Sequence, residues 1–268
     1  MSPREPRSVV SVAPGVVFVE GPVSNWVVLA EEDGVALIDA GYPADTDLVL
    51  DTVRAAGHDP ADLRRVYVTH GHVDHVGGIP GILERYPHVE VLAHADELDN
   101  VRGPERQQVT PAEIGGRLAS PRVLAWLARA IRSDALRPTT VPSARAFTGA
   151  DFAGRAIAPF PAVGHTDGST AYLLPAADAI VTGDAVVSRH DTQPGSWAPR
   201  PRMITPFFTA DQDRALESAR ALPIPPADAS AGLDKAAFNL KDFVTHIVPA
   251  SMIEAMATNE ILQIVVFS

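Results

Sequence analysis

The sequence predicts a mixed α/β sandwich built around one main domain of a 268-residue chain. Short runs rich in valine and isoleucine alternate with segments whose apolar residues recur every three or four positions, which is typical of strands that alternate with helices. The first strand candidates are joined by short turns rather than by helices, so part of the sheet is expected to be antiparallel. These observations together favour a mixed sandwich over a purely parallel sheet.

Four short runs of β-branched residues occupy the first forty positions. They begin at Val9, Val16, Asn25 and Val35, and such residues fit the pleated surface of a sheet. The letters EEDG between the last two runs have the composition of a hairpin turn. We therefore expect four strands at the start of the fold.

The next segment alternates between helix and strand. DTDLVLDTVRAAG places apolar residues on one helical face and ends at Gly57, a residue type that commonly terminates helices. A strand, RRVYVTH, follows and ends at His70. GGIPGILERYP then predicts a short helix, and VEVLAH predicts another strand.

The second half is expected to begin with helices and to return to strands. Between residues 110 and 135, Leu124, Leu127 and Ile131 are spaced three and four apart, which predicts a mostly helical region. RAIAPFPAVGH, TAYLLP and AIVTGD are the next strand candidates.

A last helix is predicted at TADQDRALESARAL. Thr209 and Gln212 would form a capping box at its start. Leu216, Ala219 and Leu222 would form its apolar stripe.

The composition of the chain changes near Pro223. Twenty arginines and no lysine precede this residue, whereas two lysines and no arginine follow it. Residues 235–268 resemble a piece of a dicarboxylate or amino-acid:cation symporter. We therefore predict a domain over residues 1–222 and an atypical tail over residues 223–268, which a fusion or a frame shift would explain.

Composition also excludes several classes of partner and chemistry. The net charge of −11 repels nucleic-acid backbones, so no nucleic-acid partner is expected. The absence of cysteine excludes disulfides, thiolate metal ligands and thiol nucleophiles. No stretch approaches the roughly 18 apolar residues of a spanning helix, so we expect no membrane insertion and a cytoplasmic location.

The motif VTHGHVDHVGG, residues 68–78, concentrates three of the nine histidines. His70 and His72 are two apart at the end of a predicted strand, so both rings can turn into one pocket, and imidazole is a common zinc ligand. Asp74 and His75 follow closely enough to hold a second ion. The interleaved acid and the two following glycines favour metal binding over a chance cluster of structural histidines.

The H-x-H-x-D-H spacing resembles the signature of the metallo-β-lactamase fold hydrolases. Further motifs of that family follow its order along the chain: IDAG with Asp39, GHTDGS with His165, and TGD with Asp184. The resemblance covers roughly residues 8–222. It implies an αββα sandwich with the metal loops along one edge.

The resemblance also implies a ligand set and a cofactor. His70, His72 and His165 would hold a first metal, Asp74 and His75 a second, and Asp184 would bridge both. One or two Zn²⁺ ions are expected, with Mn²⁺ or Fe²⁺ as alternatives.

Some acidic and imidazole side chains are left outside this implied ligand set. Asp39 is expected either beside the metal loop or as an ordinary turn residue. The remaining histidines of the domain have no ligand partner at suitable spacing and are interpreted as surface or structural: His58, His88, His94 and His190.

The implied chemistry is hydrolysis of a small molecule. Hydroxide generated between two cations would attack the carbonyl carbon of an ester, thioester, lactone or amide. Asp74 would orient the nucleophile or pass a proton to the leaving group. The proline-rich stretch after Asp184, with Trp197, Phe207 and Phe208, would either shape the pocket or cover the core.

The sequence departs from the family pattern after Leu222. The PGHG-like loop that supplies another metal-binding histidine is absent, and the only later histidine is His246, inside the tail. We therefore expect weak occupancy of the second metal site and a fold that lacks its last strand, metal loop and helix, with an exposed sheet edge.

Two other functions stay open. The chain could be a catalytically impaired, metal-binding remnant of such an enzyme, because part of the pattern is missing. It could also be a redox protein of the flavo-di-iron kind, although acidic ligands in place of histidine and a flavodoxin domain are not visible. The bridging aspartate and the lack of cysteine resemble the glyoxalase II and lactonase branches, and the acidic charge argues against the nuclease branch.

Overall fold

The computed structural model describes residues 4–103, 107–188, 190–192, 201–223 and 263–265. Most of the tail lies outside these residues, including His246 and all of the symporter-like segment except residues 263–265. Among the helices that are described, none has the length and hydropathy of a membrane-spanning helix.

A seven-stranded sheet forms the centre of the fold, with its strands in sequence order. The first four strands are antiparallel, and the remaining three continue parallel to the fourth. The strands are β1 (Ser8–Ala13), β2 (Val16–Glu20), β3 (Asn25–Glu31), β4 (Gly34–Ile38), β5 (Leu63–Tyr67), β6 (Glu90–Ala93) and β7 (Arg145–Ala146). Glu31 pairs with Gly34, which confirms the tight turn predicted between β3 and β4.

A second sheet packs on the first, with strand order β11-β10-β9-β8. Its antiparallel members come from the second half of the domain, and β11 joins in parallel from the tail. The strands are β8 (Ala158–Pro161), β9 (Thr170–Leu174), β10 (Ala179–Val181) and β11 (Gln263–Val265).

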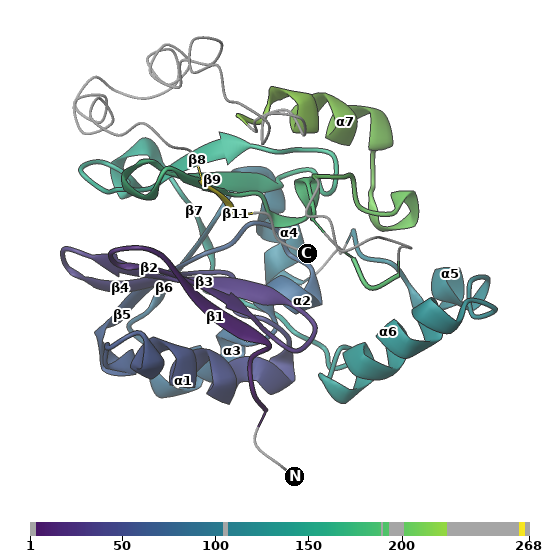
Figure 1. Ribbon diagram of the computed structural model, residues 1–268, viewed down its shortest axis with the longest axis horizontal. Coiled ribbons are helices and arrows are strands. Elements are labelled where there is room, and N and C mark those ends of the chain that lie inside the picture. Colours follow the sequence, from purple (N-terminus) through teal and green to yellow (C-terminus); the bar gives the residue numbers. More distant parts are fainter. Residues whose placement is uncertain (1–3, 104–106, 189, 193–200, 224–262, 266–268) are drawn as a thin grey trace.

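Seven α-helices connect and cover these sheets in the described part of the chain. They are α1 (Thr46–Ala55), α2 (Val73–Val76), α3 (Ile79–Arg85), α4 (Leu98–Arg102), α5 (Pro111–Gly115), α6 (Pro121–Arg132) and α7 (Gln212–Ala221). Helices α1 and α3 cover the outer face of the seven-stranded sheet, and α7 covers the outer face of the second sheet (Figure 1). The predicted αββα sandwich is therefore confirmed.

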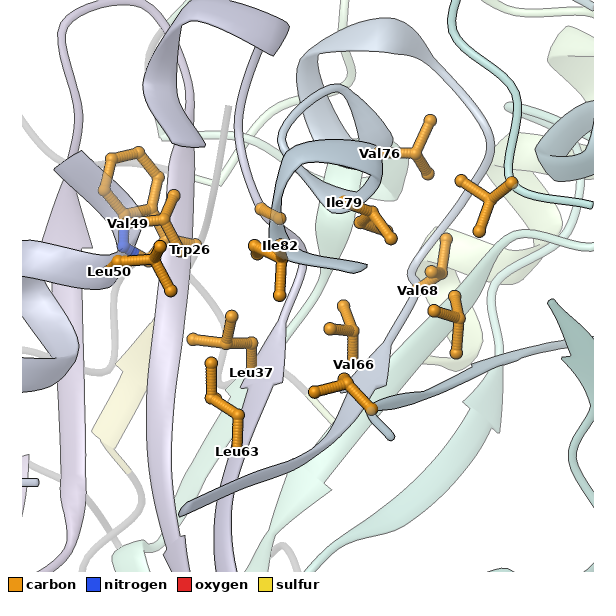
Figure 2. Packing of buried hydrophobic residues seen from close by; sticks show 14 of the residues in the cluster. Trp26, Leu37, Val49, Leu50, Leu63, Val66, Val68, Val76, Ile79 and Ile82 are labelled. Atoms are coloured by element: carbon orange, nitrogen blue, oxygen red, sulfur yellow. The ribbon is translucent and has the colours of Figure 1, made fainter. Parts of the chain in front are cut away.

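Strand residues alternate between two cores. On β3, Trp26 and Val28 belong to the cluster under α1 and α3, whereas Val27 and Leu29 belong to the cluster between the sheets. Figure 2 shows the first cluster, in which side chains of the helices meet those of the sheet. Because both faces of the central sheet are buried, its middle strands are almost continuously apolar, and a shift of register by one residue would exchange the two cores.

Helix α6 confirms the predicted helix, but Leu124 and Ile131, whose spacing helped to predict it, are not its buried residues. Leu124 and Ile131 are 48% and 46% exposed, and the buried residues of this helix are Val123 and Ala130. The apolar face of this helix is broad, with Val123 and Ala130 on one flank and Leu124 and Ile131 on the other, so spacing alone does not identify the packed part. The spacing therefore predicted the helix, and tertiary packing decides which of its sides is buried.

Two details of the C-terminal half also differ from expectation. Helix α7 is capped by Asp211, whose side chain accepts from the backbone N–H of Arg214, and not by Thr209. Leu216 is 39% exposed, although Ala219 and Leu222 do pack on the second sheet. Asp211 takes the cap because it lies immediately before the first helical residue.

The predicted exposed sheet edge is wrong for β10. Strand β11 pairs in parallel with β10, with Ile264 opposite Ile180. The reason lies in the tail sequence QIVV, whose β-branched residues suit an edge strand. The position of a further strand is therefore filled by residues from the tail.

Candidate metal centre

The candidate metal-binding side chains leave the sheets at one edge. Asp39 follows β4, and His70 and His72 follow β5. His165 lies in the turn between β8 and β9, and Asp184 follows β10. Both sheets thus contribute loops to one place, which brings together motifs that are more than one hundred residues apart in the sequence.

The first group contains His70, His72, His165 and Asp184, all of them buried. One ligand atom from each lies within 4.8 Å of the others. The centroid of the His165 ring is 4.6 Å from that of His70 and 4.7 Å from that of His72. Nε2 of His165 lies 3.1 Å from Nδ1 of His72, so two ring nitrogens point at the same small space.

The second group contains Asp74, His75 and Asp184. Nε2 of His75 lies 3.7 Å from Oδ2 of Asp74 and 3.5 Å from Oδ1 of Asp184. The other carboxylate oxygen of Asp184, Oδ2, lies 3.5 Å from Nε2 of His165 in the first group. Asp184 therefore faces both groups, one oxygen toward each.

Hydrogen bonds on the far side of the rings fix which nitrogen faces the centre. Nδ1 of His75 lies 2.7 Å from Oδ2 of Asp39, and Nε2 of His72 lies 2.6 Å from the carbonyl oxygen of Gln107. A ring N–H that donates to an acceptor leaves the opposite nitrogen with a lone pair. In the neutral rings, Nδ1 of His72 and Nε2 of His75 are therefore the candidate ligand atoms.

Several buried atoms of the site have no hydrogen-bond partner among the described residues. They include Nε2 of His70, Nε2 of His75 and Oδ1 of Asp184. A buried polar atom without a partner costs about 1–3 kcal/mol, and here these atoms converge instead of being scattered. Nitrogen and oxygen donors without thiolate, some neutral and some anionic, suit a divalent cation such as Zn²⁺.

Asp39 is more than an ordinary turn residue. Its Oδ1 accepts from the backbone N–H of Thr69, and its Oδ2 accepts from the Thr69 hydroxyl and contacts His75. The residue has a φ of 61°, in the left-handed region that aspartate tolerates better than most residues. Of the two interpretations left open by the sequence, the structure supports the one in which Asp39 lies beside the metal loop.

Burial and charge act differently on three of the histidines in the site, His70, His75 and His165. Burial, helped by the neighbouring imidazoles, lowers the pKa of His165 to about 3 and lowers the pKa of His70 well below its ordinary value. Burial acts the same way on His75, but the carboxylates of Asp39, Asp74 and Asp184 outweigh it and raise its pKa. His70 and His165 are therefore neutral near pH 7, as metal ligands must be.

Asp184 stays ionised although it is buried. Desolvation alone would raise the pKa of this carboxyl, but the charge of the neighbouring His75 holds it well below its ordinary value. A fixed negative charge therefore lies between the two groups.

Three of the remaining histidines have structural environments, as expected. Nε2 of His88 contacts the carbonyl oxygen of Leu63, and Nδ1 of His94 accepts from the backbone N–H of Asp96. His58 is part-exposed and belongs to neither group.

His190 is more closely associated with the site than its sequence context suggested. Burial lowers its pKa, while Asp184 and Asp74 act to raise it, so its ring lies within reach of their charges. The ring centroid is 5.0 Å from that of Phe208, which in turn packs at 5.4 Å from Trp126. Part of the stretch after Asp184 thus packs in an aromatic cluster with Trp126, whereas Trp197 lies outside the described residues.

Glu97 is a residue of this region that sequence reasoning missed. It is fully buried and accepts hydrogen bonds from the loops that carry His70, His72 and His165. A single glutamate in ADELDN carries no recognisable pattern. Only the folded chain brings its partners to it.

Comparison with known proteins gives the same family along most of the chain. The sequence model of the metallo-beta-lactamase superfamily matches residues 19–230. The uncharacterized protein YobT of Bacillus subtilis (strain 168) is 26% identical over 200 residues, which cover 74% of this chain and 77% of YobT.

Shorter matches have named activities. A hydroxyacylglutathione hydrolase of Photorhabdus laumondii subsp. laumondii is 38% identical over 71 residues, which cover 26% of each protein. The chain thus matches about a quarter of the length of that enzyme.

A solved structure shares the fold. The metallo-beta-lactamase SMB-1, in a complex with mercaptoacetic acid, superposes with a TM-score of 0.51 at 16% identity, covering 81% of this chain and 74% of SMB-1. At that identity the likeness shows the fold alone. On the match over residues 19–230, the chain belongs to the metallo-β-lactamase superfamily.

Proposed function

We propose that this chain is a metal-dependent hydrolase of small carbonyl substrates. The observation that carries the proposal is the pair of ligand groups that share Asp184, one oxygen toward each group. His70, His72 and His165 would hold a first cation, Asp74 and His75 would hold a second, and Asp184 would bridge them. Zn²⁺ is the cation that best suits these donors, with Mn²⁺ or Fe²⁺ as alternatives.

Bound divalent cations supply Lewis acidity and a water pKa near neutrality, so no side-chain nucleophile is needed. The protein groups supply orientation and proton transfer. Asp74 is the most exposed member of the two groups, at 27% of its side chain, so it is the one that reaches an incoming substrate. Its carboxylate would hold the attacking water and pass a proton to the leaving group of an ester, thioester, lactone or amide.

A catalytically impaired, metal-binding protein is the second candidate. The second group offers only three ligand residues, Asp74, His75 and Asp184, within the described part of the chain. A site with few protein ligands binds its ion less tightly. On this ground we propose weaker occupancy at the second group than at the first.

The domain division is also a proposal. The hydrolase domain would end near Leu222, after α7 has packed on the second sheet. The family match ends at residue 230, close to the change in composition. Residues 223–268 would then be a separate tail.

Metal analysis and a substrate panel test the hydrolase proposal. Purified protein supplied with Zn²⁺ or Mn²⁺ should hydrolyse at least one member of a panel of thioesters, lactones and aryl esters. Asp184→Asn should lose most of that activity, whereas Asp178→Asn, which changes a carboxyl outside the site, should keep it. One tightly held ion per chain with no turnover of any substrate would favour the impaired protein instead.

A further inference from the structure

Glu97 is buried, and both oxygens of its carboxylate accept hydrogen bonds. It ends the short helix η3 (Ala95–Glu97) and precedes α4, and its relative exposure is 0%. Oε1 accepts from the backbone N–H of Gly71 at 2.7 Å and from Nδ2 of Asn100 at 2.9 Å. Oε2 accepts from the hydroxyl of Thr166 at 2.7 Å and from the backbone N–H of Gly168 at 2.9 Å. Four donors offset the large cost of burying this charge.

The two oxygens of Glu97 divide between the two histidine loops. Gly71 lies between His70 and His72, and Thr166 is the residue after His165. One side chain therefore joins the loop after β5 to the loop after β8, without itself belonging to either ligand group.

Close packing at both loops fits the same role. A Cβ on Gly71 would lie 2.5 Å from Cβ of Asn100, and a Cβ on Gly168 would overlap the backbone nitrogen of Glu97. Real Cβ atoms do not approach so closely. Glycine at both positions lets the backbone N–H groups come within hydrogen-bonding distance of the carboxylate.

The network extends to the ring of His72. Asn100, a partner of Glu97, accepts from the backbone N–H of Gln107 at 2.7 Å. The backbone carbonyl oxygen of Gln107 lies 2.6 Å from Nε2 of His72. The side-chain oxygen of Gln107 accepts from the backbone N–H of Asp167 at 2.9 Å. A second bridge between the same two loops thus starts from the same carboxylate.

We propose that Glu97 is a positioning residue that holds the histidine loops at the separation a first cation requires, before the cation binds. The inference rests on the proposed function, because it assigns His70, His72 and His165 to one ion. Three imidazoles bind one cation well only when their ligand atoms already converge, and groups that orient ligands commonly change metal affinity by about 10–100-fold.

Glutamine cannot reproduce these contacts. Its amide has one acceptor oxygen and one NH₂ donor, so it can accept at only one loop at a time. The NH₂ group would face the N–H of Gly71 or that of Gly168, and neither backbone donor can turn away. Glu97→Gln should therefore release one loop while preserving side-chain volume.

The test uses the full chain and two readouts. Metal-free protein is examined by hydrogen exchange at the amides of residues 70–72 and 166–168, and zinc affinity is measured against a chromophoric chelator. Glu97→Gln should exchange faster in at least one of the loops and bind the first zinc ion about 10–100-fold more weakly. Thr166→Val should show a smaller effect confined to the His165 loop, and Thr166→Ser should restore wild-type behaviour.

A stability-matched control separates positioning from simple folding damage. Thr52→Val removes a buried hydroxyl that accepts from Nε1 of Trp26 at 2.9 Å, in the core under α1. It should lower the urea midpoint and leave loop exchange and zinc affinity unchanged. If Glu97→Gln and Thr52→Val behave alike in both readouts, Glu97 only stabilises the fold and the proposal is wrong.

The outcomes also distinguish a failure of the positioning role of Glu97 from a failure of the proposed hydrolase function. A wild-type protein without turnover or bound zinc would overturn the hydrolase, whereas loop exchange in the metal-free variants would still decide the role of Glu97. If Glu97→Gln does not fold, the pair Thr166→Val and Thr166→Ser decides: equal exchange and equal zinc affinity in these two variants would refute the proposal.

Discussion

Some groups at this site are candidate metal ligands, and others orient those ligands. The sequence identifies the ligands well and the orienting groups poorly. The candidate ligands were predicted because several lie within six positions of each other, His70 to His75, and the fold brings His165 and Asp184 to them. Glu97 and the carbonyl of Gln107 were not predicted. Their importance depends on partners far away in the sequence, and a backbone carbonyl has no residue identity to read.

Asp39 offers a test at this scale. Its carboxylate accepts from Thr69 with both oxygens and also contacts Nδ1 of His75. In Asp39→Asn one oxygen becomes a donor, so either Thr69 or His75 loses its acceptor. We expect the second cation to bind about 10–100-fold more weakly while the first is retained.

A zinc titration in competition with a chelator measures both steps for Asp39→Asn. Asp96→Asn is the control, because it removes the same charge from a carboxyl that is 66% exposed. A selective loss of the first ion would contradict the assignment of His75 to the second.

Among the elements, α7 has a role beyond covering the second sheet. The backbone N–H of Ala210 donates to the carbonyl oxygen of His165, and that of Asp211 donates to Gly164. The hydroxyl of Ser218 donates to the carbonyl oxygen of Val163 at 2.7 Å. The start of this helix therefore supports the turn that carries His165.

Gly164→Ala tests that contact. Gly164 has a φ of 119°, and a Cβ there would overlap the backbone nitrogen of Ala215 in α7. We expect a loss of about 3 kcal/mol or more in the free energy of unfolding, since backbone strain and a steric clash act together. The first zinc ion should also bind more weakly, because either α7 or His165 must move.

Gly154→Ala is the matched control for Gly164→Ala. Gly154 also has a positive φ, 75°, but a Cβ on it would meet nothing within 4 Å. It should cost only about 1 kcal/mol in urea unfolding and leave zinc affinity intact. Equal losses in the two variants would show that the contact with α7 is unimportant.

Helices and strands were easier to predict from the sequence than the contacts that each of them makes. Period-two and period-three-to-four patterns predicted most strands and helices, because apolar spacing follows backbone geometry directly. The buried side of α6 was not predictable, since Leu124 and Val123 are equally apolar and only tertiary packing selects Val123. The edge position of β11 likewise depends on a partner, β10, that is about eighty residues away.

For the molecule as a whole, the histidines of the site make the free energy of unfolding depend on pH when no metal is bound. Unfolded histidine has a pKa near 6.5. Burial lowers the folded pKa of His165 to about 3, so between these values the unfolded chain binds more protons and the free energy of unfolding falls as the pH falls. His75, whose pKa is raised, is protonated in both states below pH 6.5 and contributes nothing to this change.

Above pH 6.5 the sign reverses for His75. The folded protein keeps a proton that the unfolded chain releases, so the stability from its carboxylate partners is lost as the pH rises. Urea midpoints measured in a chelator should therefore be greatest near pH 6.5 and fall on either side. His75→Gln should remove the decline on the alkaline side, and a wild-type midpoint that rises steadily up to pH 9 would contradict the charge assignment.

If Asp184 bridges two cations as proposed, its carboxylate makes the two halves of the centre thermodynamically inseparable. By reciprocity, loading one half must change the affinity of the other by the same factor in both directions. Stoichiometry measured after replacing this one aspartate therefore says nothing about which ion was lost. Only changes at residues private to one half, such as His72 or Asp74, can tell the two occupants apart.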